Sequence, residues 1–134
     1  MTRFLTEKEV IFINALVIRK YSPKESVGVE IPELLNSAVF RPQQRLFGKD
    51  AYSTFWLKAA ALFESIAKNH AFHNANKRTA FASMKQFLWV NGYQLTVSEK
   101  DAENFTVYMV DTKPDIPLQN IANCVQTNSK ERNH

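Results

Sequence analysis

The densest group of chemically useful side chains is the segment 70–79, which reads His-Ala-Phe-His-Asn-Ala-Asn-Lys-Arg-Thr. Lys77 and Arg78 fall in the first turn of a helix that the apolar spacing predicts from Asn76 onward. Unpaired backbone N–H groups at a helix N-terminus attract anions, whereas cations placed there oppose the helix dipole. These two cations therefore indicate a bound anion, and together with Asn76 and the backbone donors they suit a polyphosphate. His70 lies just upstream and could act as a general base near neutral pH.

A structural interpretation of the same residues is the alternative. Asn76 could be only the N-cap of its helix, and His70 could be a C-capping residue of the preceding helix. Lys77 and Arg78 would then be solvated surface charges. Spacing alone leaves both interpretations open.

Other kinds of site have little support in the sequence. The chain has 3 glycines, too few and too dispersed for a dinucleotide-binding fingerprint or a P-loop. His70 and His73 could place two imidazoles near one metal ion, but no third ligand is evident. Because Cys124 is the only cysteine, we expect no internal disulfide and no multi-cysteine zinc site, which fits a reducing compartment.

Composition predicts one soluble globular domain. The chain has 134 residues, of which 45% are hydrophobic and 22% charged. Its net charge of 17 − 13 = +4 favours anionic partners such as phosphates, but no predicted helix has a basic face suited to reading nucleic acid. The most apolar stretch, Val10–Ile18, is much shorter than the roughly 20 residues of a membrane span. We therefore expect a cytoplasmic protein without membrane contact.

End signals and apolar spacing predict six helices. The first begins at a capping box formed by Thr6 and Glu9 and ends near Tyr21, before Pro23. Apolar residues on more than one of its faces predict that this helix is well buried. The other helices are expected over residues 32–40, 53–69, 76–91, 99–110 and 117–125.

The remaining segments complete an all-α prediction. We expect a turn at 47–50, and the alternating segment 93–97 could be extended. From Gln126 onward the chain is polar, and this end is expected to fray. The whole predicts a single compact bundle of about six helices over residues 1–126, followed by a polar tail at 127–134.

Residues 70–78, His-x-Phe-x-x-Ala-Asn-Lys-Arg, resemble the signature of the Fic/Doc family. In Fic enzymes this motif reads His-Pro-Phe-x-Asp/Glu-Gly-Asn-Gly-Arg, and Lys77 in place of the last Gly is typical of the Doc branch. The resemblance extends over roughly residues 28–97. Its other Doc-like features are Arg41-Pro42, Phe47-Gly48, Lys68-Asn69-His70 and Phe87-Leu88-x-x-Asn91-Gly92.

The resemblance implies an all-helical fold and a transfer reaction. Fic enzymes transfer AMP from ATP to a protein hydroxyl, whereas Doc-type toxins phosphorylate a threonine of elongation factor Tu and stall translation. By this resemblance His70 would take the hydroxyl proton, and Asn76, Lys77 and Arg78 would hold the phosphates of ATP. Phe72 would anchor the motif loop in the core. A small antitoxin protein is the implied partner.

The motif departs from the family pattern at Asn74, where the family has an Asp or Glu that binds Mg²⁺. Because an amide oxygen binds Mg²⁺ more weakly than a carboxylate, we expect weakened metal binding, a slow enzyme or a member that only binds a partner. Ala75 replaces the Gly of Fic enzymes, as Doc proteins tolerate. The leading interpretation is phosphoryl transfer. AMP transfer is the alternative, although Lys77 would crowd the α-phosphate.

A partial match to the self-inhibitory motif of the family begins at Ser26 and reaches Glu30. Ile31 then stands where that motif has Gly or Asn. We interpret the match as coincidental and expect inhibition by a separate protein.

Overall fold

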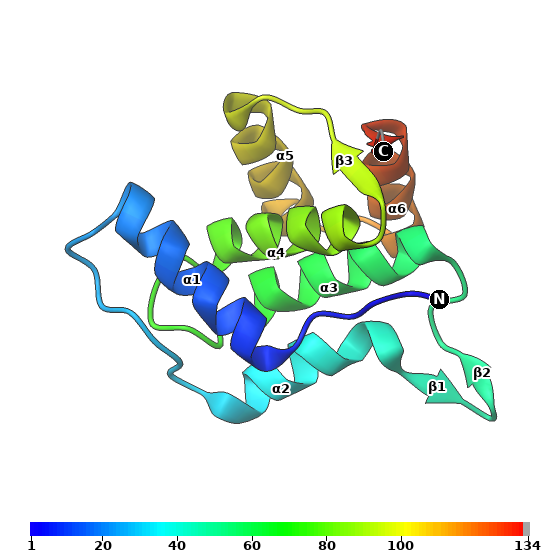
Figure 1. The fold of residues 1–134 in the computed structure, drawn as a ribbon, viewed down its shortest axis with the longest axis horizontal. Helices are drawn as coiled ribbons and strands as arrows, with labels where there is room; N and C mark the ends of the chain where they lie inside the picture. The colour runs from blue at the N-terminus through cyan, green and yellow to red at the C-terminus, as the bar shows by residue number, and fades with distance from the viewer. Residues whose placement is uncertain (133–134) are drawn as a thin grey trace.

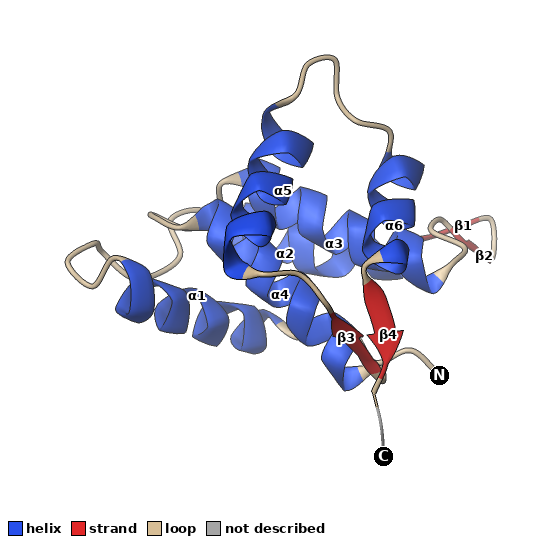
Figure 2. Ribbon diagram, turned by 90° about the horizontal axis from the view of Figure 1, so that it is seen from above, coloured by secondary structure: helices blue, strands red, loops and turns tan. Residues whose placement is uncertain are grey.

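The computed structural model describes residues 1–132 and is predominantly helical, as predicted (Figure 1). Two small antiparallel sheets, Arg45–Leu46 with Lys49–Asp50 and Tyr93–Leu95 with Ser129–Glu131, accompany the helices (Figure 2). The elements in chain order are α1 (Glu7–Tyr21), α2 (Pro32–Phe40), the 3-10 helix η1 (Arg41–Gln43), β1 (Arg45–Leu46), β2 (Lys49–Asp50), α3 (Phe55–Asn69), α4 (Asn76–Val90), β3 (Tyr93–Leu95), α5 (Glu99–Asp111), α6 (Leu118–Thr127) and β4 (Ser129–Glu131).

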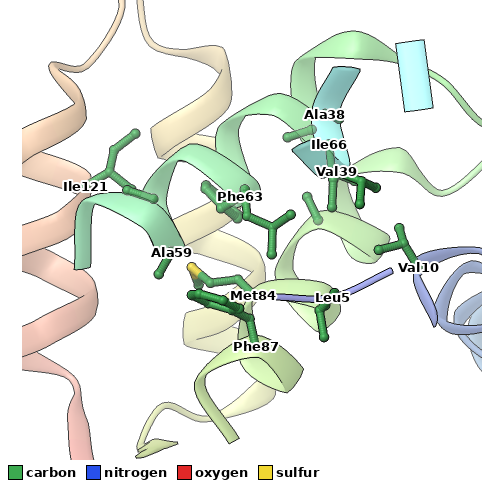
Figure 3. Packing of buried hydrophobic residues seen from close by; sticks show 14 of the residues in the cluster. Leu5, Val10, Ala38, Val39, Ala59, Phe63, Ile66, Met84, Phe87 and Ile121 are labelled. Carbon is green, nitrogen blue, oxygen red and sulfur yellow. The ribbon is translucent and has the colours of Figure 1, made fainter. Parts of the chain in front are cut away.

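The centre of the fold is the pair of helices α3 and α4, which lie side by side (Figures 1 and 2). The consecutive residues Ala59, Ala60 and Ala61 of α3 are all 0% exposed, so α3 is covered on every side at this level. Their small side chains allow neighbouring helices to approach closely. Around them Phe63 of α3 and Phe87 of α4 fill the core, which Figure 3 shows from close by.

Local end signals set the helix boundaries where the sequence placed them. The capping box of α1 is complete, with the Glu9 N–H donating to the Thr6 hydroxyl and the Thr6 N–H donating to the Glu9 carboxylate. Ser98 caps α5 by accepting from the Asp101 N–H. Gly92 follows α4 with φ 93°, a left-handed conformation that lets the chain turn sharply into β3.

The burial of α1 was overestimated. Ile11, Phe12 and Leu16 are 37%, 61% and 47% exposed. The reason is the position of α1 at the edge of the bundle, where it packs against α4 and α2 on one side only (Figure 1). Its apolar residues outnumber the places available on the packed face.

The expected frayed end was wrong for the described part of the C-terminus. Helix α6 continues to Thr127, and Ser129–Glu131 then pair as β4 with β3, in the register Leu95↔Ser129. The backbone N–H of Thr96 also donates to the carbonyl of Asn128. Residues 133–134 of the predicted tail lie outside the described residues. Within residues 1–132, none of the helices combines the length and the apolar character needed to cross a membrane.

Candidate functional site

A cleft of about 470 Å³ opens between the end of α1 and the beginning of α4. Four of the predicted site residues line it together, namely His70, Asn76, Lys77 and Arg78. The other lining residues are Tyr21, Ser22, Glu25 and Ala75.

Two residues in the left-handed conformation bring His70 and the start of α4 to the same cleft. His70 is the C-cap of α3 with φ 52°, and Ala75 is the N-cap of α4 with φ 62°. This conformation costs a residue with a Cβ about 1–2 kcal/mol, so the surrounding contacts must hold the loop in place. His70 therefore has the capping position of the structural interpretation, while its exposed ring lines the cleft.

Asn76 holds the motif loop closed. Its Oδ1 accepts from the Phe72 N–H and its Nδ2 donates to the Phe72 carbonyl, both at 3.0 Å. The ring of Phe72, 2% exposed, lies in the hydrophobic core. Because Ala75 is the N-cap, the interpretation of Asn76 as a simple N-cap was wrong. With both ends of its amide engaged, Asn76 has its backbone N–H to offer to a phosphate.

A residue that the sequence analysis did not assign to the site, Asn14, fastens the loop to α1. It is 0% exposed, and its Nδ2 donates to the carbonyl of Asn74 and to the hydroxyl of Thr79, each at 3.0 Å. The available signal was its position as the polar residue within the apolar stretch Val10–Ile18. Burial of a polar group is favourable only with hydrogen-bond partners, which the motif supplies to Nδ2, whereas the buried Oδ1 of Asn14 has no partner among the described residues.

Lys77 is tied to α5 at the margin of the cleft. Its Nζ lies 2.8 Å from Oδ2 of Asp111, and the two side chains are 40% and 50% exposed. This ion pair joins the first turn of α4 to the last residue of α5.

Arg78 stacks on an aromatic ring from α1. Its guanidinium carbon lies 4.3 Å from the centroid of the Tyr21 ring. The Tyr21 hydroxyl donates to Glu99 of α5 at 3.2 Å, and Lys20 donates to the same carboxylate oxygen at 3.2 Å. These hydrogen bonds, from Lys20 first and then Tyr21, lower the pKa of Glu99 below its ordinary value. The Tyr21 ring that lies against Arg78 is thus hydrogen-bonded to helix α5.

Asn74, the predicted metal position, has a structural contact. Its Nδ2 donates to the carbonyl of Ser26 at 3.1 Å, in the loop after α1, and Asn74 does not line the cleft. In the described part of the chain, no three His, Cys, Asp or Glu side chains gather into a metal-binding group.

The loop after α1 runs antiparallel to the motif. Val29 and Phe72 form a β-bridge, and the His73 N–H donates to the Gly28 carbonyl at 3.1 Å. Glu30 places Oε2 3.0 Å from Nδ1 of His73. The carboxylate of the partial self-inhibitory motif therefore contacts His73, and neither of these two residues lines the cleft.

Two comparisons with known proteins cover these residues. A model of the Fic/DOC family matches residues 4–88, which include every residue that lines the cleft. The curated protein Toxin Doc of Mycolicibacterium smegmatis (strain ATCC 700084 / mc(2)155) is 41% identical to this chain over 95 residues. That alignment spans 71% of this chain and 69% of the relative.

Proposed function

This chain belongs to the Fic/Doc family, in its Doc branch, and on that premise we propose that it is a toxin that phosphorylates a translation factor. The donor would be ATP, and the acceptor a hydroxyl side chain of elongation factor Tu, as the Doc resemblance implies. The observation that carries the proposal is the shared cleft of His70, Lys77 and Arg78 at the N-terminus of α4. A base, two cations and unpaired backbone donors in one cleft suit phosphoryl transfer.

The residues of the cleft have separate roles in this reaction. The His70 ring would accept the proton of the target hydroxyl as its oxygen forms a bond to the γ-phosphorus. The bond from that phosphorus to the β,γ-bridging oxygen breaks, and ADP leaves. Arg78 can hold two phosphate oxygens with its planar fork, already oriented by the Tyr21 ring. Lys77 can reach a phosphate only by leaving or sharing its contact with Asp111.

Mg²⁺ would offset phosphate charge in such a reaction, but position 74 does not fit the ion. The Nδ2 of Asn74 is bound to the Ser26 carbonyl, and its side chain is outside the set that lines the cleft. We therefore assign no Mg²⁺ ligand to Asn74.

We also propose that a separate antitoxin controls the enzyme. The name of the Mycolicibacterium relative, a toxin, supports a partner of this kind. The contact of Glu30 with His73 supports it too, since the chain's own partial inhibitory motif is engaged there. Copurification of the protein with a small protein encoded beside it, and relief of toxicity by coexpression, would test this part.

One experiment separates the possible reactions. The purified protein is incubated with cell extract, Mg²⁺ and ATP labelled in parallel at the γ- or the α-phosphate. Phosphoryl transfer marks a protein with the γ-label alone, and the mass of the modified peptide identifies the group. Transfer of the α-label would show AMP transfer instead. Absence of both labels, with binding of a partner, would identify a member that only binds. The His70→Ala variant is the control for contaminating kinases.

A further inference from the structure

Glu25 is the one acidic side chain among the residues 1–132 that line the cleft. It faces a site whose other charged residues are Lys77 and Arg78, and it forms no ion pair with any described residue. The side chain is exposed to solvent. Neither the proposed mechanism nor the core uses it.

The backbone on both sides of Glu25 is held in place. Before it, the Glu25 N–H donates to the carbonyl of Ser22, next to the end of α1, at 2.9 Å. After it, the Ser26 carbonyl accepts from the Nδ2 of Asn74, and the Gly28 carbonyl accepts from the His73 N–H. The loop that carries Glu25 is therefore fastened both to α1 and to the motif.

The tie at Ser26 depends on an amide at position 74. A carboxylate has only acceptor oxygens, so an aspartate there could not donate to the Ser26 carbonyl. Asn74, which stands where the family has a carboxylate, is thus also the residue that holds the loop next to Glu25 in place.

An isolated carboxylate in a phosphate-binding cleft repels its ligand unless a cation lies between them. Mg²⁺ is commonly bound by one or two carboxylates, phosphate oxygens of the substrate and several waters. We infer that Glu25 supplies the protein carboxylate for the Mg²⁺ of bound nucleotide, replacing the ligand that the family has at position 74. This inference rests on the proposed function, because it requires nucleotide in the cleft.

The test is a calorimetric titration of ATP into the wild type and Glu25→Gln, once with Mg²⁺ in excess and once with EDTA. Gln keeps the size of the side chain and removes its charge. With Mg²⁺ the variant should bind ATP about tenfold more weakly, in line with the loss that a disturbed metal shell causes. With EDTA it should bind as well as the wild type or better, because the repulsion is gone. Electron paramagnetic resonance of Mn²⁺ in the presence of ATP gives a direct second measurement, and its bound signal should fall in the variant.

Glu103→Gln is the matched control. Glu103 is an exposed residue of α5 outside the cleft, and the substitution makes the same change in net charge. It should leave ATP affinity unchanged with Mg²⁺ and with EDTA.

Two results would overturn the inference while leaving the proposed function intact. Tighter ATP binding by Glu25→Gln under both conditions would show that Glu25 only repels the nucleotide. Equal binding by the variant and the wild type under both conditions would show that Glu25 does not meet the metal. A wild-type chain that binds no ATP under either condition would refute the proposed function, and this inference with it.

Discussion

The ion pair between Lys77 and Asp111 should compete with the binding of a nucleotide phosphate to Lys77. A phosphate that recruits Lys77 must draw its ammonium group away from a carboxylate 2.8 Å distant. Asp111→Asn removes that competing charge while keeping the shape of the side chain. We therefore expect the variant to bind ATP more tightly than the wild type.

The size of the effect follows from the exposure of the pair. The side chains are 40% and 50% exposed, so the contact belongs with solvent-exposed ion pairs, which contribute about 0.2–1 kcal/mol. At about 1.4 kcal/mol per factor of ten, the affinity for ATP should rise by at most about fivefold. Asp111 also lies at the C-terminal end of α5, where a negative charge opposes the helix dipole. Its neutralisation should therefore leave the melting temperature unchanged or slightly raised.

A double-mutant cycle decides whether the effect passes through Lys77. Calorimetry with ATP would compare the wild type, Asp111→Asn, Lys77→Met and the double variant. The gain from Asp111→Asn should vanish when Lys77 is already Met, and it should shrink at high salt. The reasoning is refuted if Asp111→Asn weakens ATP binding, or if its gain persists in the Lys77→Met background.

Three further variants test the site. His70→Ala should reduce γ-label transfer by about 10²–10⁴-fold without changing the melting temperature, and undiminished toxicity would exclude His70 as the base. Arg78→Ala should weaken ATP binding in calorimetry more than Lys77→Ala does, since only Arg78 can hold two phosphate oxygens; equal or no losses would return both residues to the solvated-surface interpretation. Asn74→Asp loses the hydrogen bond to Ser26, so the free energy of unfolding should fall by about 1 kcal/mol. Amide hydrogen exchange in the loop after α1 should then be faster, and unchanged exchange would contradict this role of Asn74.

Helix boundaries could be predicted from the sequence because their signals are local. The hydrogen bonds between Thr6 and Glu9 and the cap at Ser98 join residues a few positions apart. The exposure of Phe12 could not be predicted in this way. It depends on how many neighbours α1 receives, which is decided by the packing of helices that are distant in sequence.

The site, too, combines residues that are close in sequence and could be predicted with contacts between distant residues that could not. His70, Lys77 and Arg78 are near neighbours in the chain, so one turn between two helices brings them to one cleft. Their supporting contacts come from far away, since Asp111 is 34 residues from Lys77 and Asn14 is 60 residues from Asn74. A single sequence offers no spacing rule for such pairs. The position of Asn14 as the one polar residue in the apolar stretch Val10–Ile18 was the available hint.

Three amide side chains build the motif loop, and their chemistry limits what position 74 can do. Asn76 both donates to and accepts from the backbone of Phe72, Asn14 donates to the carbonyl of Asn74, and Asn74 donates to the carbonyl of Ser26. Each donated hydrogen bond requires an N–H that a carboxylate lacks, whereas the bond that Asn76 accepts does not. At position 74 the side chain can therefore fasten the loop or supply a charged metal ligand, but one residue cannot do both. The amide found in this chain selects the first role, so a protein carboxylate for Mg²⁺ would have to come from another segment, and Glu25, in the loop that Asn74 fastens, lines the cleft.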